Sequence, residues 1–335
     1  MLGHAPDEHS CLSSSVPASP QQEADDEAVA WGGQWGVGLD LPPPVFPQLV
    51  VLPPPSTLVE LYEAIRSFPA STTLGVDMLN PRIFLRLPRV FLLQLLILFA
   101  ICEILGAWPT QIATVLIPLL PKKTGGRRPI GIFPSFIRLW FRLRSPIVRA
   151  WERSHARSFF YAGAGAGADV ASWIQASLLE NAAAARLASA ASLIDLVKAF
   201  ERVPHQQLVA EGLHWDYPMW ILRLTIAAYR LGRRISIGGI VSGMIFALRG
   251  ITAGSVTATT ELRLLLLRAL DGLVAASPVP LQVYVDDIFQ HFAASLKVVI
   301  RDLPVAFRLM ALALEGLGLE VSRLKSGGLA SSSAL

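Results

Sequence analysis

The chain has 335 residues, and 53% of them are hydrophobic, which is enough to bury a large core in one large domain or two modest ones. Its charge is uneven: no Lys or Arg precedes Arg66, so the rest of the chain holds all 29 bases against 16 acids, a balance that suits a polyanionic partner. Two distant cysteines, Cys11 and Cys102, exclude a zinc ribbon and a disulfide scaffold, so no disulfide partner is expected.

Residues 1–56 are rich in Pro, Ser, Gly, Ala and acids, with Pro-Pro-Pro at 42–44 and again at 53–55. This composition predicts a disordered or extended acidic segment ahead of a body that spans residues 57–335. The residues that could dock on the body are Trp31, Trp35, Phe46 and 49–52. The segment lacks the basic and apolar regions of a secretory signal, so we expect an intracellular protein.

The body opens with a short amphipathic pattern, Leu58 to Phe68, which predicts a helix capped by Ser56 or Thr57. A long apolar stretch follows: Val90 to Trp108 carries one charge, that of Glu103.

We expect a buried helix over this stretch, ending before Pro109. The uncharged part is shorter than the roughly 20 residues of a membrane span, and Glu103 would be costly in a bilayer. Membrane association is therefore not expected, although the mean hydropathy of +0.49 leaves a membrane-associated protein as an alternative.

The most basic part of the chain runs from Lys122 to Arg157, with ten Lys or Arg residues and one acid. The β-branched and apolar residues 112–120 before it predict a strand, and Thr124-Gly125-Gly126 predicts a hairpin turn that brings bases to a strand tip. Residues 136–150 predict a helix with its apolar face inward and its arginines outward. Bases interleaved with aromatics suit nucleic acid, and the candidate contacts are Arg127, Arg138, Arg142 and Arg144.

The glycine-rich run at 163–168 is not a phosphate-binding loop, because no Gly-Lys-Ser/Thr follows it. A turn is expected there instead. The elements predicted after it are helices at 170–190, 218–231, 257–276 and 296–317, a strand pair at 233–241 around Gly238-Gly239, and a brief strand at Val321.

The sequence Tyr284-Val285-Asp286-Asp287 places two adjacent carboxylates between apolar β-formers, which predicts two short strands with the acids at the turn between them. Adjacent like charges push their pKa values apart unless a cation neutralises them, and a divalent metal with oxygen ligands is the natural partner. An ordinary Asp-Asp turn is the alternative.

A third carboxylate, Asp195, ends the apolar stretch that begins upstream of Leu193. Three carboxylates at two strand ends could hold two Mg²⁺ ions about 3.5–4 Å apart for phosphoryl transfer. Asp195 could equally cap a helix, and the two roles are compatible.

From about Leu58 to Leu329 the chain resembles reverse transcriptases of the non-LTR retrotransposon, or LINE-like, type. Six blocks occur in the order typical of that family. They are Leu74–Pro81, Ile117–Ile130, Asp195–His205, Arg249–Ser255, Tyr284–Asp287 and Gly316–Ser326.

The resemblance implies an α+β fold, the fingers and palm of a right-hand polymerase, with fingers at about 57–190 and a palm at about 191–335 whose antiparallel sheet packs on helices. It implies an RNA-directed DNA polymerase that uses an RNA template, a DNA primer, dNTPs and two Mg²⁺ ions, with Mn²⁺ as a possible substitute. It also suggests a location in the nucleus or cytoplasm.

The resemblance assigns roles to single residues. Asp195, Asp286 and Asp287 would be the catalytic metal ligands, and Phe200 would be the steric gate that rejects a ribose 2′-OH. The residues expected to contact the nucleotide are Lys122, Lys123, Arg128, Phe200, Gly254 and Lys325.

The chain departs from the family pattern at Thr252-Ala253-Gly254, where many relatives carry Pro-Gln-Gly. We also expect an incomplete thumb after Lys325 and no endonuclease ahead of the fingers. These departures keep open the alternative of a catalytically inactive retroelement remnant that binds nucleic acid.

Overall fold

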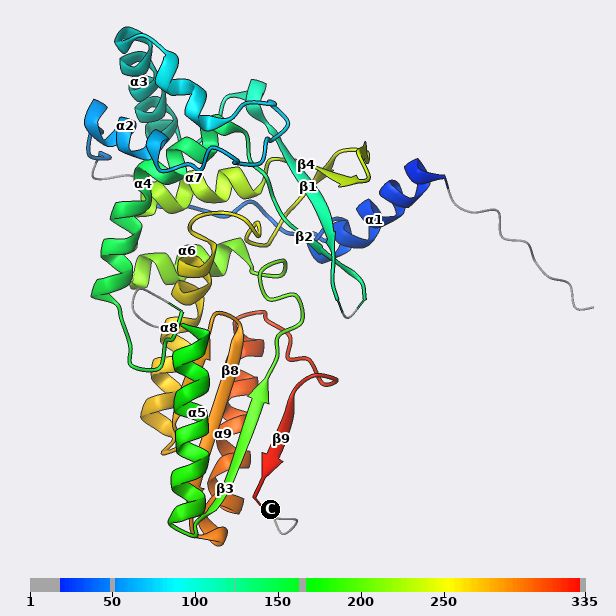
Figure 1. The fold of residues 1–335 in the computed structure, drawn as a ribbon, viewed down its shortest axis with the longest axis vertical. Helices are drawn as coiled ribbons and strands as arrows, with labels where there is room; N and C mark the ends of the chain where they lie inside the picture. The colour runs from blue at the N-terminus through cyan, green and yellow to red at the C-terminus, as the bar shows by residue number, and fades with distance from the viewer. Residues whose placement is uncertain (1–18, 49–51, 124, 163–166, 332–335) are drawn as a thin grey trace, which may run out of the picture.

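The computed structural model describes residues 19–48, 52–123, 125–162 and 167–331. The molecule is elongated, with one sheet toward each end and helices α6 and α8 between them (Figure 1). The α-helices are α1 (Pro20–Gln34), α2 (Leu58–Arg66), α3 (Arg89–Leu105), α4 (Ser135–Ser154), α5 (Ala168–Ala184), α6 (His205–His214), α7 (Met219–Tyr229), α8 (Ala258–Ala276) and α9 (Leu296–Gly316). Two 3₁₀-helices, Pro81–Arg86 and Thr110–Ile112, are the remaining helical segments of the described residues.

The first sheet is mixed and has the order β2-β1-β4-β5, with β6 also paired to β4. Its strands are β1 (Thr114–Pro121), β2 (Arg127–Pro129), β4 (Gly232–Ile237), β5 (Ile240–Val241) and β6 (Ile245–Phe246). Strand β1 runs parallel to β4 and antiparallel to β2. Strands β1 and β2 therefore flank the predicted hairpin turn, of which Thr124 lies outside the described residues, and β4 and β5 form the predicted strand pair.

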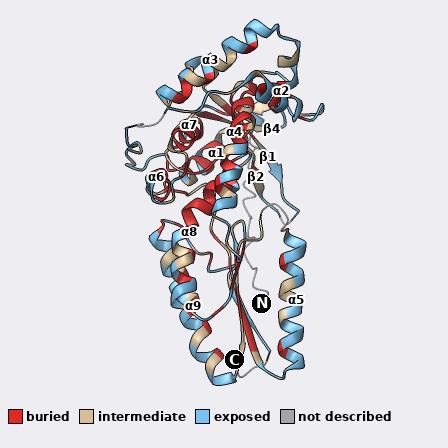
Figure 2. Ribbon diagram, turned by 90° about the vertical axis from the view of Figure 1, so that its left-hand side faces the viewer, coloured by how far each residue is buried: buried red, intermediate tan, exposed pale blue. Residues whose placement is uncertain are grey.

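The second sheet is antiparallel and has the order β7-β8-β3-β9. Its strands are β3 (Ala188–Ile194), β7 (Leu281–Tyr284), β8 (Asp287–Ala294) and β9 (Gly327–Ala330). Figure 2 shows this sheet edge-on, with α9 along one face and α5 along the other. The prediction of an antiparallel sheet packed on helices is confirmed.

Helix α8 lies at the centre of the molecule, and its leucines from Leu262 to Leu267 are inaccessible to solvent. Arg268 on the same helix is exposed, so the leucine-rich part of α8 faces the core while its polar residues reach the surface. Buried residues concentrate around α4, α7 and α8, whereas α5 and α9 have exposed outer faces (Figure 2). The second sheet is thus an extension from a compact centre.

The expectation of a disordered or extended segment over residues 1–56 is wrong for helix α1. Ser19 caps it by accepting a hydrogen bond from the backbone N–H of Gln22, and Pro20 occupies its first position. Trp31 and Trp35 are buried against the body, as their predicted docking requires. Burial of these two indoles stabilises a helix that is too short to form alone.

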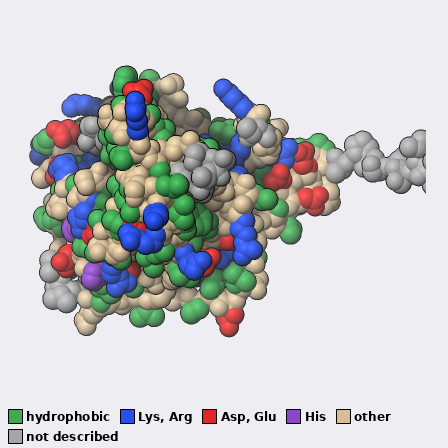
Figure 3. Space-filling view, turned by 90° about the horizontal axis from the view of Figure 1, so that it is seen from below, with side chains coloured by type: hydrophobic (Ala, Val, Ile, Leu, Met, Phe, Trp, Pro, Cys, Tyr) green, Lys and Arg blue, Asp and Glu red, His purple; other side chains and the backbone are tan. Residues whose placement is uncertain are grey.

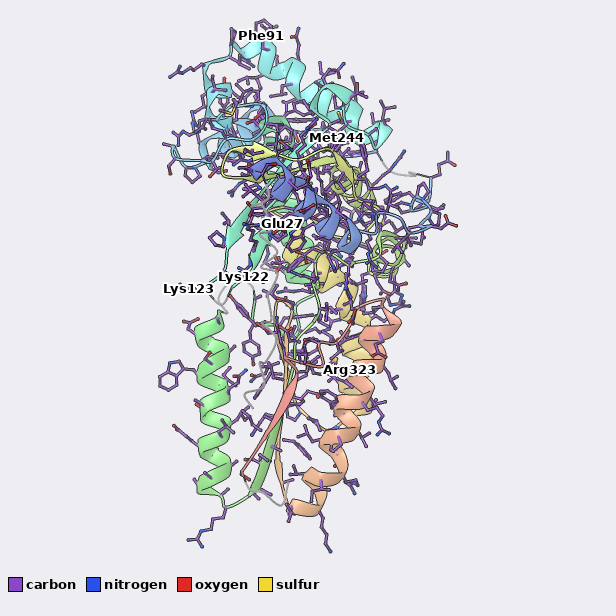
Figure 4. All side chains as sticks on the ribbon, turned by 90° about the vertical axis from the view of Figure 1, so that its right-hand side faces the viewer. Glu27, Phe91, Lys122, Lys123, Met244 and Arg323 are labelled. Carbon is purple, nitrogen blue, oxygen red and sulfur yellow. The ribbon has the colours of Figure 1, made fainter. Side chains whose placement is uncertain are left out.

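Helix α3 forms where expected, but the prediction that it is buried is wrong. One narrow face packs inward through Leu92, Phe99 and Cys102, while Phe91 and Ile97 are 53% and 60% exposed. Phe91 projects from the far end of the molecule in Figure 4. No helix in the described part of the chain is long and apolar enough to cross a membrane.

Arg144 faces inward, so its predicted role in binding nucleic acid is a misassignment. Its guanidinium forms two hydrogen bonds, of 2.6 and 2.8 Å, with the carboxylate of fully buried Glu103 on α3. Trp140 donates a third, of 2.7 Å, to the same carboxylate. The indole ring of Trp220 lies under the guanidinium, with its centroid 4.8 Å away. The pair joins α3 to α4 and satisfies both buried charges.

Replacing Glu103 with Gln is expected to lower the free energy of unfolding by about 3 kcal/mol, because it leaves the buried charge of Arg144 without a counter-charge. Urea denaturation would measure the change. Asp302→Asn provides the matched control, because its partner Arg301 is exposed and an ion pair at the surface contributes little to stability. Equal losses in the two variants would contradict the structural role of the buried pair.

Three further predicted elements differ from the observed ones. The helix expected at 170–190 ends at Ala184, because β3 begins at Ala188. Val321 forms a single bridge with Leu196 in place of a strand, and β9 was not predicted. The turn expected at 163–168 falls largely outside the described residues.

Candidate active site

Two of the predicted carboxylates lie at the β7–β8 turn. Tyr284 pairs with Asp287 across the hairpin, so Val285 and Asp286 form a two-residue turn, and Val285 adopts a left-handed φ of 60°. Asp287 is the first residue of β8. The predicted arrangement of strand, acidic turn and strand is confirmed.

The strand register brings the third carboxylate to the same place. Ile194 on β3 pairs with Ile288 on β8, so Asp195 follows β3 beside Asp287. Residues opposite one another on antiparallel strands have Cβ atoms about 4.5–5.5 Å apart. Asp195 opens a turn, and the helix that it was alternatively expected to cap does not form there.

The electrostatics of the three carboxylates agree with this proximity. Burial raises the pKa of Asp286, and the negative charges of Asp287, Asp195 and Glu201 raise it further. Burial also raises the pKa of Asp287, with a further contribution from Asp195, against a lowering by Lys325. A site that destabilises its own negative charges favours a cation.

The candidate site holds cations from three separate segments. Lys325 lies with its Nζ 3.5 Å from Oδ2 of Asp195, an oxygen that is buried and has no hydrogen-bond partner. Burial lowers the pKa of Lys198, Glu201 opposes this, and Lys122 and Lys325 lower the pKa further, so the ammonium groups are within electrostatic reach of Lys198, whose own Nζ lies 4.2 Å from the centroid of the Trp31 ring. Exposed Lys122 and Lys123 stand at the tip of the β1–β2 hairpin, facing the second sheet (Figure 4).

Metal-binding geometry is not preformed in this arrangement. Within the described ranges, no group of three or more His, Cys, Asp or Glu side chains is close enough to hold a metal ion. The donor chemistry fits a hard divalent cation nevertheless, because the three carboxylates lie at neighbouring strand ends and Oδ2 of Asp195 is buried without a hydrogen-bond partner.

Residues Arg249–Ser255 form the block to which the resemblance assigns the gripping of primer and nucleotide, and they are called the gripping segment below. This segment packs against the turn that follows Asp195. The backbone N–H of Ile251 donates to the carbonyl of Phe200 at 2.7 Å, and Phe200 is partly buried against the core. Gly254 has a φ of +105°, and a Cβ there would lie 2.5 Å from the carbonyl oxygen of Gly131. Only glycine fits this close approach, so Gly254 joins the β1–β2 region to the segment before α8.

Arg127 and Arg128 occupy different positions on β2. Arg128 is exposed near the hairpin tip. Arg127 forms ion pairs with Glu23 and Glu27 of α1, and these acids raise its pKa. The chain's own acidic helix therefore neutralises the side chain that was predicted to contact nucleic acid.

Arg138 and Arg142 lie one turn apart on α4, and both guanidinium groups stack on the ring of Phe68. They line a cavity of about 300 Å³ that also reaches Gly254 and Val256. Both arginines thus lie next to the gripping segment, as a contact with nucleic acid would require. Their contact with nucleic acid stays a prediction.

The largest cavity described, of about 800 Å³, was missed by the sequence reasoning. It runs from α4 past the start of α8 to Tyr284 and Val285 at the acidic turn. Its basic residues are Arg149, Arg153, Arg157 and Arg263. A signal for two of them was present in the sequence, because Arg149 and Arg153 are four residues apart and so share one face of α4.

Two of these four arginines already have partners, since Arg157 pairs with Asp271 and Arg263 pairs with Glu152. The exposed side chains of Arg149 and Arg153 remain as the cations of the cavity wall. On the face seen in Figure 3, Lys and Arg are spread over the body, and acids gather near the N-terminal segment at the right.

No family model matches the chain, and no curated protein matches it. Among solved structures, one that matches is that of apo telomerase from Candida tropicalis truncated from the C-terminal domain, with 14% sequence identity and a TM-score of 0.49. The match covers 67% of this chain and 51% of that one, so this chain spans about half of its length. A likeness of this size assigns neither family nor function.

Proposed function

We propose that the chain is an RNA-directed DNA polymerase of the non-LTR type, in which the β1–β2 hairpin belongs to the fingers and the second sheet to the palm. The observation that carries the proposal is the convergence of Asp195, Asp286 and Asp287 at one end of the second sheet. The ammonium of Lys325 lies beside this end, and Lys198 is within electrostatic reach of both Lys325 and Lys122. Carboxylates opposite ammonium groups form the environment that a metal-bound triphosphate requires.

Each group has a part in nucleotidyl transfer. Asp195, Asp286 and Asp287 would hold two Mg²⁺ ions, or Mn²⁺ in their place, which lower the pKa of the primer hydroxyl and stabilise the entering and leaving oxygens. Arg128, Lys122 and Lys123 at the hairpin would clamp the triphosphate. Lys325 would release Asp195 and bind a phosphate oxygen. Phe200 would close the sugar pocket against a 2′-OH.

Template and primer would follow the two basic cavities. Arg138 and Arg142 line the one beside the gripping segment, and Arg149 and Arg153 line the one that ends at the acidic turn. Guanidinium groups neutralise phosphates, and the aromatic rings between them provide surfaces for base stacking.

Primer extension on poly(rA)·oligo(dT) with Mg²⁺ or Mn²⁺ tests the proposal, and incorporation of dTTP is the expected result. Binding of the same duplex should weaken as salt rises, because each phosphate contact releases a counterion. Arg149→Gln together with Arg153→Gln should reduce the slope of log K against log[salt] by about 2. Incorporation that is absent with both metals would contradict the polymerase proposal.

An inactive remnant that binds nucleic acid is the second candidate. It is favoured by the ammonium of Lys325 on Asp195, by the absence of a preformed three-ligand group in the described residues, and by Ala253 where relatives carry Gln. It predicts salt-dependent binding without incorporation.

A further inference from the structure

Helix α1 ends against the segment that grips the nucleotide. The backbone carbonyl of Trp35 accepts hydrogen bonds from the N–H groups of Leu248 and Arg249, at 2.9 and 3.2 Å. The carbonyl of Gln34 accepts another, of 3.0 Å, from Nε of Arg249. The chain that enters the gripping segment is therefore fixed by residues more than 200 positions upstream.

The indole of Trp35 makes a second connection, through Arg233. The guanidinium of Arg233 lies 4.4 Å from the centroid of the Trp35 ring, and both side chains are buried. Burial lowers the pKa of Arg233 to about 9, so the guanidinium is still charged at neutral pH. A buried cation over an indole is among the stronger interactions of this type.

Arg233 also contacts the gripping segment directly. Its terminal nitrogen donates 2.9 Å hydrogen bonds to Oγ1 of Thr252 and to the carbonyl of Tyr229. Thr252 is buried and precedes Ala253, whose carbonyl accepts from the N–H of Gly131. Trp35, Arg233, Thr252 and Ala253 also line one small cavity. A continuous path of contacts thus runs from α1 to the backbone of the gripping segment.

We propose that Trp35 is a positioning residue of the nucleotide site, which fixes Thr252 and the backbone of Ala253 and Gly254 through Arg233. The inference rests on the proposed polymerase function, and it assigns to an N-terminal helix a part of the nucleotide site. It accounts for the burial of Trp35 at the C-terminal end of α1. It also supplies rigidity at a segment whose Ala253 has no side chain able to hold a nucleotide.

Trp35→Ala is expected to raise the KM for dTTP about tenfold in primer extension, with kcat and the Kd for template–primer within about twofold of wild type. Tenfold corresponds to about 1.4 kcal/mol. Trp35→Phe retains a ring under Arg233 and should restore most of the affinity. A merely structural role would lower the amount of folded protein and leave the KM of the folded fraction unchanged.

Trp220→Ala is the matched control, because Trp220 stacks on buried Arg144 in the same manner but lies away from the gripping segment. It should lower thermal stability and leave the KM for dTTP unchanged. Thr252→Val removes the acceptor of Arg233 and tests the path independently of any damage to α1. Because Trp35 and Thr252 act through one guanidinium, their effects on KM should be less than additive in the double variant.

Calorimetric binding of dTTP to the protein–template–primer complex separates this inference from the polymerase proposal. A wild type without incorporation, but with dTTP binding weakened about tenfold by Trp35→Ala, would refute the polymerase and support the positioning role. An active wild type whose KM and dTTP affinity are unaffected by Trp35→Ala would refute the positioning role alone. Additive effects in the double variant would also overturn the proposed path.

Discussion

Replacing Asp286 with Asn is expected to abolish incorporation, with a loss of about 10³-fold or more in kcat, while the protein remains folded. A metal ion stabilises the charge of a phosphoryl-transfer transition state by several kcal/mol, and about 4 kcal/mol corresponds to roughly 10³ in rate. Asp286 occupies the turn itself, where Asn fits without steric conflict. Primer extension beside the wild type measures the loss.

The same variant should unfold at a higher temperature than the wild type at pH 7 in metal-free buffer. Burial and the neighbouring carboxylates raise the pKa of Asp286, so the folded chain holds this proton more tightly than the unfolded chain does. The pKa of this carboxyl in the unfolded chain is the ordinary value of 3.8. As the pH rises above 3.8, the unfolded chain releases the proton first, so the free energy of unfolding falls. Asn carries no charge and escapes this loss.

The two measurements together separate chemistry from folding. Activity should fall while the unfolding midpoint rises, and the difference in midpoint should shrink toward pH 4. Retained activity in Asp286→Asn would contradict the metal mechanism. A lowered midpoint at pH 7 would contradict the electrostatic account of the acidic turn.

The acidic turn could be predicted from the sequence because it depends on local patterns. Apolar β-formers on both sides of Asp286 and Asp287 fix a hairpin, and the period of two residues along a strand fixes which side chains face the core. Once β3 pairs with β8, Ile194 must oppose Ile288 to keep the apolar faces together, and Asp195 then falls beside Asp287.

The docking of Trp31 and Trp35 could be predicted, but the helical form of α1 could not, because its stability comes from residues more than 90 positions away. Its acids pair with Arg127, and Trp35 meets Arg233 and Arg249. The local composition, with proline triplets on its C-terminal side, favours an extended chain, and tertiary contacts override that preference.

The sequence predicts burial wrongly for one side chain of α4 and for most of α3. An arginine at a helical position reads as a surface residue, yet Arg144 is buried because Glu103 lies opposite it on another helix. The apolar run of α3 reads as a core helix, yet the structure buries one narrow face of it. Composition gives the cost of exposing a side chain, and only the packing of the other elements decides whether it is covered.

The second large effect is expected at Glu261, in the first turn of α8. This carboxyl is fully buried, and burial raises its pKa to about 8 from an ordinary value of 4.5. The hydroxyl of Tyr229 lies 2.5 Å from its Oε2, and Oε1 has no hydrogen-bond partner. The carboxyl is therefore protonated at neutral pH, directly behind the gripping segment that ends at Ser255.

The wild type should lose stability as the pH rises from about 4.5 to about 8, because over this window the folded chain retains a proton that the unfolded chain has released. At about 1.4 kcal/mol per pH unit, the separation of the two pKa values corresponds to about 5 kcal/mol. Above pH 8 the contribution becomes constant. Glu261→Gln has no proton to lose, so its advantage over the wild type should grow across this window and then level off.

Urea denaturation of both proteins between pH 5 and pH 9 measures this difference. Glu63→Gln makes the same chemical change at an exposed position of α2 and provides the baseline. A difference between Glu261→Gln and wild type that is independent of pH would show that the buried carboxyl is ionised throughout. A growing difference would show that the carboxyl of Glu261, at the start of α8, is neutral in the folded protein below about pH 8.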